Sequence, residues 1–169
     1  PANLVVDPAT NEVYVADGYG NRRVIVLDGE TFAFKRMWGA YGNRPSDMDL
    51  GPYDPDAPPA QQFRLPHNIS ISRDGFVYVA DRPNNRIQVF TREAKFLKQV
   101  RVTNDANTVV SVPAGFAFSP DEKQQFLYVV DSGPMRVVIF DRATMTQIGV
   151  IGVKGTGVGG FDIVHHMAA

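Results

Sequence analysis

The chain has 169 residues, of which 44% are hydrophobic and 21% are charged, and this composition predicts a compact globular unit rather than a disordered segment. Its formal net charge at pH 7 is −1, which provides no broad basic field for phosphate backbones, so nucleic acid is not expected as the main partner. No apolar run is long enough to span a bilayer, and the absence of cysteine excludes disulfides and thiolate metal sites.

Three segments of the chain share one pattern of strand, turn and strand. They are VYVADGYGNRRVIVLD at 13–28, VYVADRPNNRIQVFT at 77–91 and LYVVDSGPMRVVIFD at 127–141. In each segment, alternating β-branched and aromatic residues end at an aspartate, a short turn follows, and an arginine begins the returning run. Each segment is therefore predicted to form an antiparallel hairpin.

A first strand before each hairpin and a fourth strand after it complete a four-stranded unit. The expected first strands are NLVVDP, HNISISRDG and AGFAFSPDE, and expected fourth strands are FAFKRMWG and KFLKQVRV. Units of this kind are the blades of an all-β propeller. The predicted blades span about 1–40, 63–102 and 113–151, with the first strand of a further blade at 161–169. The segment 40–62 is rich in proline, glycine and aspartate and predicts a long inserted loop.

An aspartate and an arginine recur at fixed positions of the blades, and we expect them to serve the fold. The aspartates are Asp17, Asp81 and Asp131, and the arginines are Arg23, Arg86 and Arg136. The aspartates can accept hydrogen bonds from turn amides, and the arginines can pair with a carboxylate of their own or a neighbouring blade.

Three blades are fewer than the roughly four to eight with which propellers close, so two sheet edges and their apolar faces would be left bare. We therefore expect either a longer protein of which this chain is a part or self-association that covers the open edges. The first is favoured because the sequence stops within the expected strand, at HHMAA.

The three histidines, His67, His165 and His166, fall at the starts of expected inner strands, which line the channel of a propeller. Imidazoles from two blades can converge on a zinc ion near the axis. A hydrogen-bonded structural role is the alternative, and the residues alone favour neither. Because consecutive side chains of a strand point to opposite faces, His165 rather than His166 is expected to face the channel.

The runs VYVAD, NNRIQVF and KFLKQV resemble the NHL repeat, whose six-bladed propellers bind proteins, RNA or small ligands. The longer runs DPATNEVYVADGYGNRRV, QFRLPHNISI and FDIVHHMAA resemble the catalytic core of peptidyl-α-hydroxyglycine α-amidating lyase and its bacterial relatives. That family cleaves a peptidyl-α-hydroxyglycine into a peptide amide and glyoxylate, with zinc held by histidines near the channel. The resemblance also favours a secreted or periplasmic location, although the residues themselves indicate no compartment.

The resemblance implies a zinc site. The family's Pro-His motif makes His67 a zinc ligand, and its Phe-Asp-x-x-His motif makes His165 a second one. The family's third zinc histidine and a further arginine belong to blades that precede residue 1. Around its second histidine the family has a proline before and a calcium-binding aspartate after, whereas this chain has Val164 and His166, so calcium is not expected.

The resemblance also implies two catalytic residues. Tyr19 follows an Asp-Gly pair as the family's catalytic tyrosine does, and Arg82 follows an Ala-Asp pair as its active-site arginine does. A tyrosine that accepts a proton needs a metal or a cation nearby, which Arg82 or Arg23 can supply. Arg82 can also bind a substrate carboxylate through two parallel hydrogen bonds. The alternatives are a packing aromatic for Tyr19 and a solvated turn residue for Arg82.

Three functions are compatible with these features. The leading hypothesis is a zinc-dependent lyase-like propeller that takes a peptide or small-molecule substrate into its channel. The second is a non-catalytic NHL propeller that binds a protein or peptide partner, because one fold hosts many functions. The third is a lactone or ester hydrolase with calcium in the channel, which converging acidic and asparagine ligands would favour.

Overall fold

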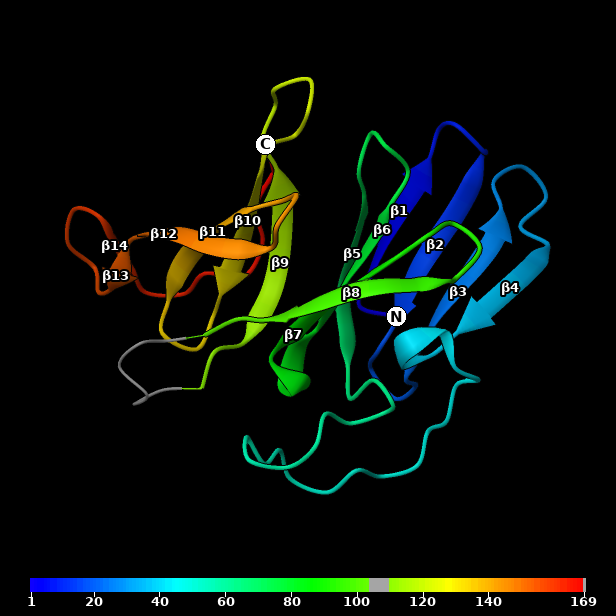
Figure 1. Cartoon of the computed structure of the whole chain (residues 1–169), viewed down its shortest axis with the longest axis horizontal. Coiled ribbons are helices and arrows are strands. Elements are labelled where there is room, and N and C mark those ends of the chain that lie inside the picture. The colour runs from blue at the N-terminus through cyan, green and yellow to red at the C-terminus, as the bar shows by residue number, and fades with distance from the viewer. Residues whose placement is uncertain (104–109, 169) are drawn as a thin grey trace.

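The computed structural model describes residues 1–103 and 110–168, and these contain three four-stranded antiparallel sheets (Figure 1). The first sheet comprises β1 (Asn3–Asp7), β2 (Glu12–Asp17), β3 (Arg23–Asp28) and β4 (Phe34–Trp38). The second comprises β5 (Pro66–Ile71), β6 (Val77–Asp81), β7 (Arg86–Phe90) and β8 (Phe96–Arg101). The third comprises β9 (Pro113–Phe118), β10 (Phe126–Asp131), β11 (Arg136–Asp141) and β12 (Thr146–Ile151). The predicted all-β architecture of propeller blades is confirmed.

Each sheet follows the order of the chain, so every strand pairs with its sequence neighbour. The first strands of successive sheets contact one another, β1 with β5 and β5 with β9. In Figure 1 these first strands face the middle of the array, whereas β4 and β12 lie at its two outer sides. Side chains at the start of a first strand therefore come together from different blades, as they do at the axis of a propeller.

The core lies between the sheets, and the two middle strands of the second sheet, β6 and β7, are buried on both faces. In β6, Val77 and Val79 pack into the cluster between the first and second sheets, while Tyr78 and Ala80 pack into the cluster between the second and third. This division follows from the alternation of side chains along a strand. Complete burial of a valine side chain stabilises the fold by roughly 1.5–3 kcal/mol, so both faces contribute to the stability of the second sheet.

The recurring aspartate and arginine pair within their own blade. The Nε–Oδ2 distances are 3.0 Å for Arg23–Asp17, 2.9 Å for Arg86–Asp81 and 3.1 Å for Arg136–Asp131. The second oxygen of Asp81 accepts hydrogen bonds from the backbone N–H groups of Arg64 and Leu65, and that of Asp131 accepts one from Val112. The carboxylate thus joins each hairpin to the residues that lead into its first strand, as expected from the sequence.

The connections between the sheets carry the short elements of the structure. A 3-10 turn, η1 (Ala40–Gly42), begins the link from β4 to β5, and residues 43–65 of that link contain neither helix nor strand. Another, η2 (Arg82–Asn84), joins β6 to β7. In the part of the chain that the structure describes, no helix is long and apolar enough to cross a membrane.

The segment after the third sheet differs from the strand expected over 161–169. It contains a short parallel pair of β13 (Val153–Lys154) and β14 (Gly160–Phe161), and residues 162–168 form no strand. Residue 169, the last of the expected strand, lies outside the described residues. No strand of a further sheet is available to pair with 162–168 among the described residues, so their backbone lacks the ladder that a β-strand requires.

Candidate functional site

His67 lies at an irregularity near the start of β5. The pairing of β5 with β6 shifts between Pro66 and Asn68, so His67 is the extra residue of a β-bulge. A bulge bends its strand and re-aims the side chain that it carries. The His67 side chain is only 1% exposed and lies against the neighbouring third sheet. The strand β9 has the same irregularity, and there Ala114 takes the position of His67.

The hydrogen bonds of His67 fix its tautomer. Its Nδ1 atom lies 2.6 Å from the carbonyl oxygen of Ala114, which can only accept, so Nδ1 carries the proton. The Nε2 atom is then unprotonated and accepts a hydrogen bond from the Tyr19 hydroxyl at 3.1 Å. Burial lowers the pKa of His67, and the nearby charge of Arg82 lowers it further. The tautomer therefore leaves Nε2 unprotonated, and its lone pair is occupied by the Tyr19 hydroxyl group.

The other two histidines lie beside His67. The ring centroid of His165 is 4.8 Å from that of His67, and the centroid of His166 is 6.0 Å away. The Nδ1 atoms of His165 and His166 are 2.7 Å apart, so one of them donates a hydrogen bond to the other. Burial, followed by the neighbouring His166 and Arg82, lowers the pKa of His165.

The expectation that His165 rather than His166 faces the channel stays a prediction, although the His166 ring also lies near His67. It rested on strand alternation, and residues 162–168 do not form a strand. Without the pleat, consecutive side chains are free to turn to the same side. This segment packs closely on β9, where a Cβ atom at Gly115 would lie 3.1 Å from the carbonyl oxygen of His165. The predicted proximity of His67 and His165 is observed, and His166 joins them.

Tyr19 reaches His67 from the turn between β2 and β3. The preceding residue, Gly18, packs so tightly on β5 that a Cβ atom there would lie 2.3 Å from the Pro66 carbonyl oxygen. Glycine is the residue that permits such a close backbone approach. The Tyr19 ring meets the His67 ring edge-on, with centroids 5.8 Å apart, and it is 56% exposed. Its hydroxyl group is thus both anchored and open to solvent.

Arg82 begins η2, and its backbone N–H donates to the Leu65 carbonyl oxygen at 3.1 Å. Its charge is among the causes that lower the pKa of both His67 and His165. Within the described residues its guanidinium group has no hydrogen bond or ion pair. Arg23, the other cation considered for this role, is instead paired with Asp17. Of the two arginines, Arg82 is the one without a carboxylate partner among the described residues.

The histidine nitrogens fit part of a zinc site. An imidazole whose Nδ1 donates to a backbone carbonyl presents Nε2 as a ligand, which is a common arrangement around zinc. His67 has this arrangement, and His165 is the second imidazole from another part of the chain. Among the described residues no group of three or more histidine, aspartate or glutamate side chains could hold a metal ion. These two imidazoles are fewer than the three or four ligands that zinc takes.

Two features of the site were not anticipated from the sequence. The Ala114 carbonyl holds the His67 ring, and its signal is the alignment of PHN at 66–68 with PAG at 113–115. Asn68 is 94% buried, and its Oδ1 atom has no hydrogen-bond partner among the described residues. Its Nδ2 atom lies near Gly115, where the segment carrying His165 crosses β9. Asn68 is thus a further polar group beside the histidines.

Comparison with known proteins gives relatives that agree with this architecture. Residues 63–90 match the family of the NHL repeat. The whole chain aligns at 32% identity with "Peptidyl-glycine alpha-amidating monooxygenase A" of Xenopus laevis, of which it spans 17%. Over 92% of its length it is 29% identical to "NHL repeat-containing protein 3" of Homo sapiens, of which it spans 39%.

A solved structure supports the fold. The "Kuenenia stuttgartiensis Hydrazine Synthase" chain superposes on 89% of this chain with a TM-score of 0.62, and 35% of that chain is covered. The identity is 18%, so this likeness shows the fold alone. Since the chain spans well under two thirds of its relatives, their complete activities are not transferred by similarity alone.

Proposed function

We propose that this chain, an NHL-repeat domain related at about 30% identity to peptidyl-glycine alpha-amidating monooxygenase, forms part of a zinc-dependent amidating-lyase site. The substrate is a peptidyl-α-hydroxyglycine, and the products are a peptide amide and glyoxylate. The observation that carries the proposal is the hydrogen bond from Tyr19 to the bare Nε2 atom of His67, with His165 4.8 Å away between ring centroids. Three residues far apart in the sequence thereby share one site.

The proposed roles follow from the chemistry of each side chain. His67 and His165 would hold zinc through imidazole nitrogens, and bound zinc would favour loss of the proton from the substrate's hydroxyl group. Zinc would take the Nε2 lone pair that the Tyr19 hydroxyl group occupies here, and the Tyr19 oxygen would then accept the substrate's proton. Arg82 holds the substrate carboxylate with two parallel N–H donors. As the carbon–nitrogen bond breaks, its electron pair goes to the amide nitrogen, which takes up a proton. The hydroxyl oxygen becomes the aldehyde oxygen of glyoxylate.

A test of the catalytic role uses N-benzoyl-α-hydroxyglycine as substrate and measures glyoxylate release in the presence of zinc. Tyr19→Phe keeps the ring beside His67 and removes only the hydroxyl group. We expect the rate to fall by about 10²–10⁴-fold, the range typical of a lost general base. Tyr128→Phe, a half-buried tyrosine of the third sheet, should leave the rate unchanged. Equal rates for the parent chain and Tyr19→Phe would eliminate Tyr19 as the proton acceptor.

The metal is tested separately by elemental analysis of the purified chain. His67→Ala and His165→Ala should each lower the zinc content, whereas His166→Ala should retain it if His165 is the ligand of the pair. Retention of zinc in both His67→Ala and His165→Ala would contradict the proposed ligands. Calcium is measured in the same sample, since the residues after His165 argue against a calcium site.

A propeller that binds a protein or peptide without cleaving it is the second candidate. It is favoured by the apolar residues that the first and third sheets expose, such as Leu4 at 59% and Ile148 at 54%. Exposed apolar side chains on one face of a sheet are typical of interaction surfaces. Saturable binding of a peptide amide with no glyoxylate release from the α-hydroxyglycine substrate would support this function over the lyase.

A further inference from the structure

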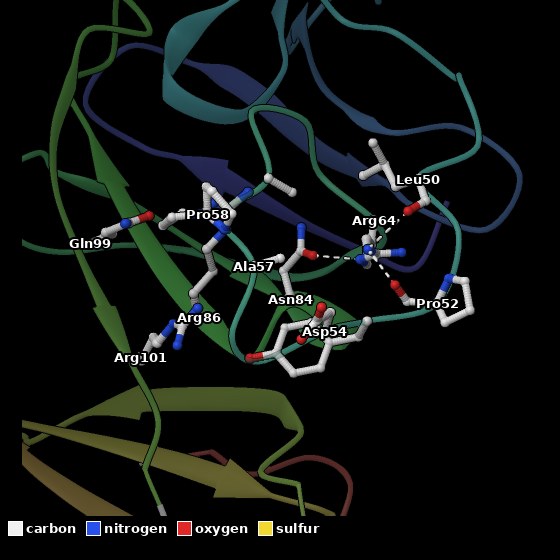
Figure 2. Close-up of a pocket in the computed structure, with 13 residues that line it drawn as sticks. Leu50, Pro52, Asp54, Ala57, Pro58, Arg64, Asn84, Arg86, Gln99 and Arg101 are labelled. Carbon is white, nitrogen blue, oxygen red and sulfur yellow. Dashed lines mark hydrogen bonds between the residues drawn. The ribbon is translucent and has the colours of Figure 1, made fainter.

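A pocket separate from the histidine cluster lies between the long link from β4 to β5 and the second sheet (Figure 2). Its volume is about 300 Å³, which is in the range of small-molecule sites. The link provides Leu50, Pro52, Tyr53, Asp54 and the run 57–60, and the second sheet and its approach provide Arg64, Asn84, Arg86, Gln99 and Arg101. The pocket shares η2 with the candidate site, because Asn84 and Arg82 belong to the same turn.

The two sides of the pocket differ in chemistry. The side formed by the link is mostly apolar, with proline, alanine and leucine side chains around Pro58. The side formed by the second sheet is polar and carries the guanidinium groups of Arg86 and Arg101 with the amide of Gln99 (Figure 2). A ligand that fills this space must therefore have an apolar part and a polar part that accepts hydrogen bonds.

The positive charges of the pocket are only partly balanced. Arg86 is paired with the buried Asp81 at 2.9 Å. Arg64 donates to neutral groups, the Asn84 Oδ1 atom at 2.7 Å and the carbonyl oxygen of Pro52 at 3.0 Å among them. Arg101 is exposed, and within the described residues its one hydrogen bond goes to the Pro55 carbonyl oxygen at 3.2 Å.

Asp54 is the one carboxylate among the residues that line the pocket, and it forms no ion pair within the described chain. Two guanidinium charges without a carboxylate partner, those of Arg64 and Arg101, therefore face one carboxylate. The excess positive charge lies next to apolar surface. Apolar surface beside a guanidinium group lowers the local dielectric and strengthens its attraction for an anion.

The amide of Gln99 adds a neutral donor. Its Oε1 atom accepts a hydrogen bond from Gln88 Nε2 at 3.0 Å, which fixes the orientation of the amide. The Gln99 Nε2 atom is left with its two N–H groups, and no acceptor for them occurs among the described residues. Gln99 and Arg101 lie two residues apart on β8, so their side chains share one face of the strand.

We propose that this pocket binds a small organic carboxylate. The carboxylate accepts hydrogen bonds from Arg101 and Gln99, and the apolar part packs against the proline-rich side around Pro58. A bare inorganic anion would leave the apolar side unused, and a neutral amide would leave the charge of Arg101 without a partner. The site is independent of the lyase proposal because its ligand is recognised by binding alone.

Benzoate is the probe, and its binding to the whole chain is measured by calorimetric titration at low salt. Benzamide has the same shape without the charge, and we expect it to bind at least about tenfold more weakly. Arg101→Gln should weaken benzoate binding by a similar factor, because it removes the charge and the paired donors of the guanidinium group. Arg44→Gln removes an exposed arginine of the same link outside the pocket and should bind benzoate like the parent chain.

Gln99→Ala provides a second variant, with an expected loss of a few-fold, and circular dichroism establishes that each variant is folded. The proposal is overturned if benzoate does not saturate the chain at millimolar concentration, if benzamide binds equally well, or if Arg101→Gln binds as the parent does. Inorganic phosphate that binds while benzoate does not would also overturn it. These outcomes leave glyoxylate release by the histidine site untouched, so the two proposals fail separately.

Discussion

At the scale of single residues, the structure shows how one backbone carbonyl decides the chemistry of a side chain. The Ala114 oxygen takes the proton-bearing nitrogen of His67, and this leaves the other nitrogen bare in the direction of Tyr19. A similar principle holds on the first sheet, where the buried Glu12 is surrounded by donors: Arg36 at 2.6 Å, Lys35 at 2.7 Å and the Tyr14 hydroxyl at 2.8 Å. The partner of His67 determines which ring nitrogen carries the proton, and the partners of Glu12 favour its ionised carboxylate.

Glu12 leads to a prediction about pH. Hydrogen bonding to Arg36 holds the pKa of this carboxyl far below its usual range. A depressed pKa means that the ion pairs stabilise the fold above the unfolded-state pKa, near 4.3, and that this contribution is lost as pH falls through the folded-state pKa. Glu12→Gln should therefore cost about 2 kcal/mol at pH 7, and the cost should shrink in acid.

Urea unfolding of the parent chain and Glu12→Gln between pH 7 and pH 2.5 measures this effect. Glu30→Gln changes an exposed residue in the turn between β3 and β4; it is the control and should follow the parent at every pH. A stability difference for Glu12→Gln that stays constant down to the acid limit would refute the assignment of the ion pairs as its source.

Gly18 leads to a second prediction at this scale. A methyl group there would meet the carbonyl oxygen of Pro66 at 2.3 Å, so Gly18→Ala must displace the turn that carries Tyr19 from β5. Overpacking of this kind costs roughly 1–3 kcal/mol. Gly157→Ala is the matched control, since nothing lies within 4 Å of the added atom. Thermal unfolding of both variants decides the matter, and similar midpoints would mean that the turn does not depend on the close approach.

At the scale of elements, the repeated Asp–Arg pair is the link that holds each hairpin to its first strand. Its environment changes along the chain: the Arg23 side chain in the first sheet is 30% exposed, whereas the Arg86 side chain in the second is 3% exposed. Removing one partner of a buried pair is more costly than removing one of an exposed pair, because the remaining charge has lost access to water.

We therefore expect Asp81→Asn to destabilise the chain by roughly 3–5 kcal/mol, and Asp17→Asn by roughly 1 kcal/mol. Chemical denaturation of the two variants measures the difference. The double variant Asp81→Asn with Arg86→Met should recover part of the loss, since no buried charge then remains. Equal losses for Asp81→Asn and Asp17→Asn would show that burial does not control the strength of the pair.

The same elements show which features of the structure could be predicted from the sequence. The hairpins could be predicted because alternation and turn residues are local, and β6 and β7 lie where VYVAD and RIQVF indicate. The contact of His67 with Ala114 depends on two bulges in different sheets, which no local pattern encodes. The position of His166 depends on a segment that lacks a pairing strand among the described residues. The candidate residues could thus be identified from their order in the sequence. Their distances from one another depend on packing between blades and could not be predicted.

At the scale of the whole molecule, the three sheets are not equivalent, because only the second is covered on both faces. On the faces turned away from the second sheet, the first sheet exposes Leu4, Phe34 and Met37, and the third exposes Ile151. Apolar side chains in such positions are typical of surfaces that another sheet covers. In a closed ring each sheet would have a neighbour on either side.

This asymmetry predicts that the isolated chain self-associates through the outer faces of its first and third sheets. Sedimentation velocity between about 1 and 100 µM should show a mass that rises with concentration. Leu4→Asp and Ile151→Asp add a charge to one outer face each and should keep the chain monomeric over that range, because burying an unpaired carboxylate is costly. Val158→Asp, which is fully exposed in the turn between β13 and β14, should associate like the parent. A parent chain that stays monomeric throughout, or face variants that associate as the parent does, would mean that these faces do not drive association of the chain with itself.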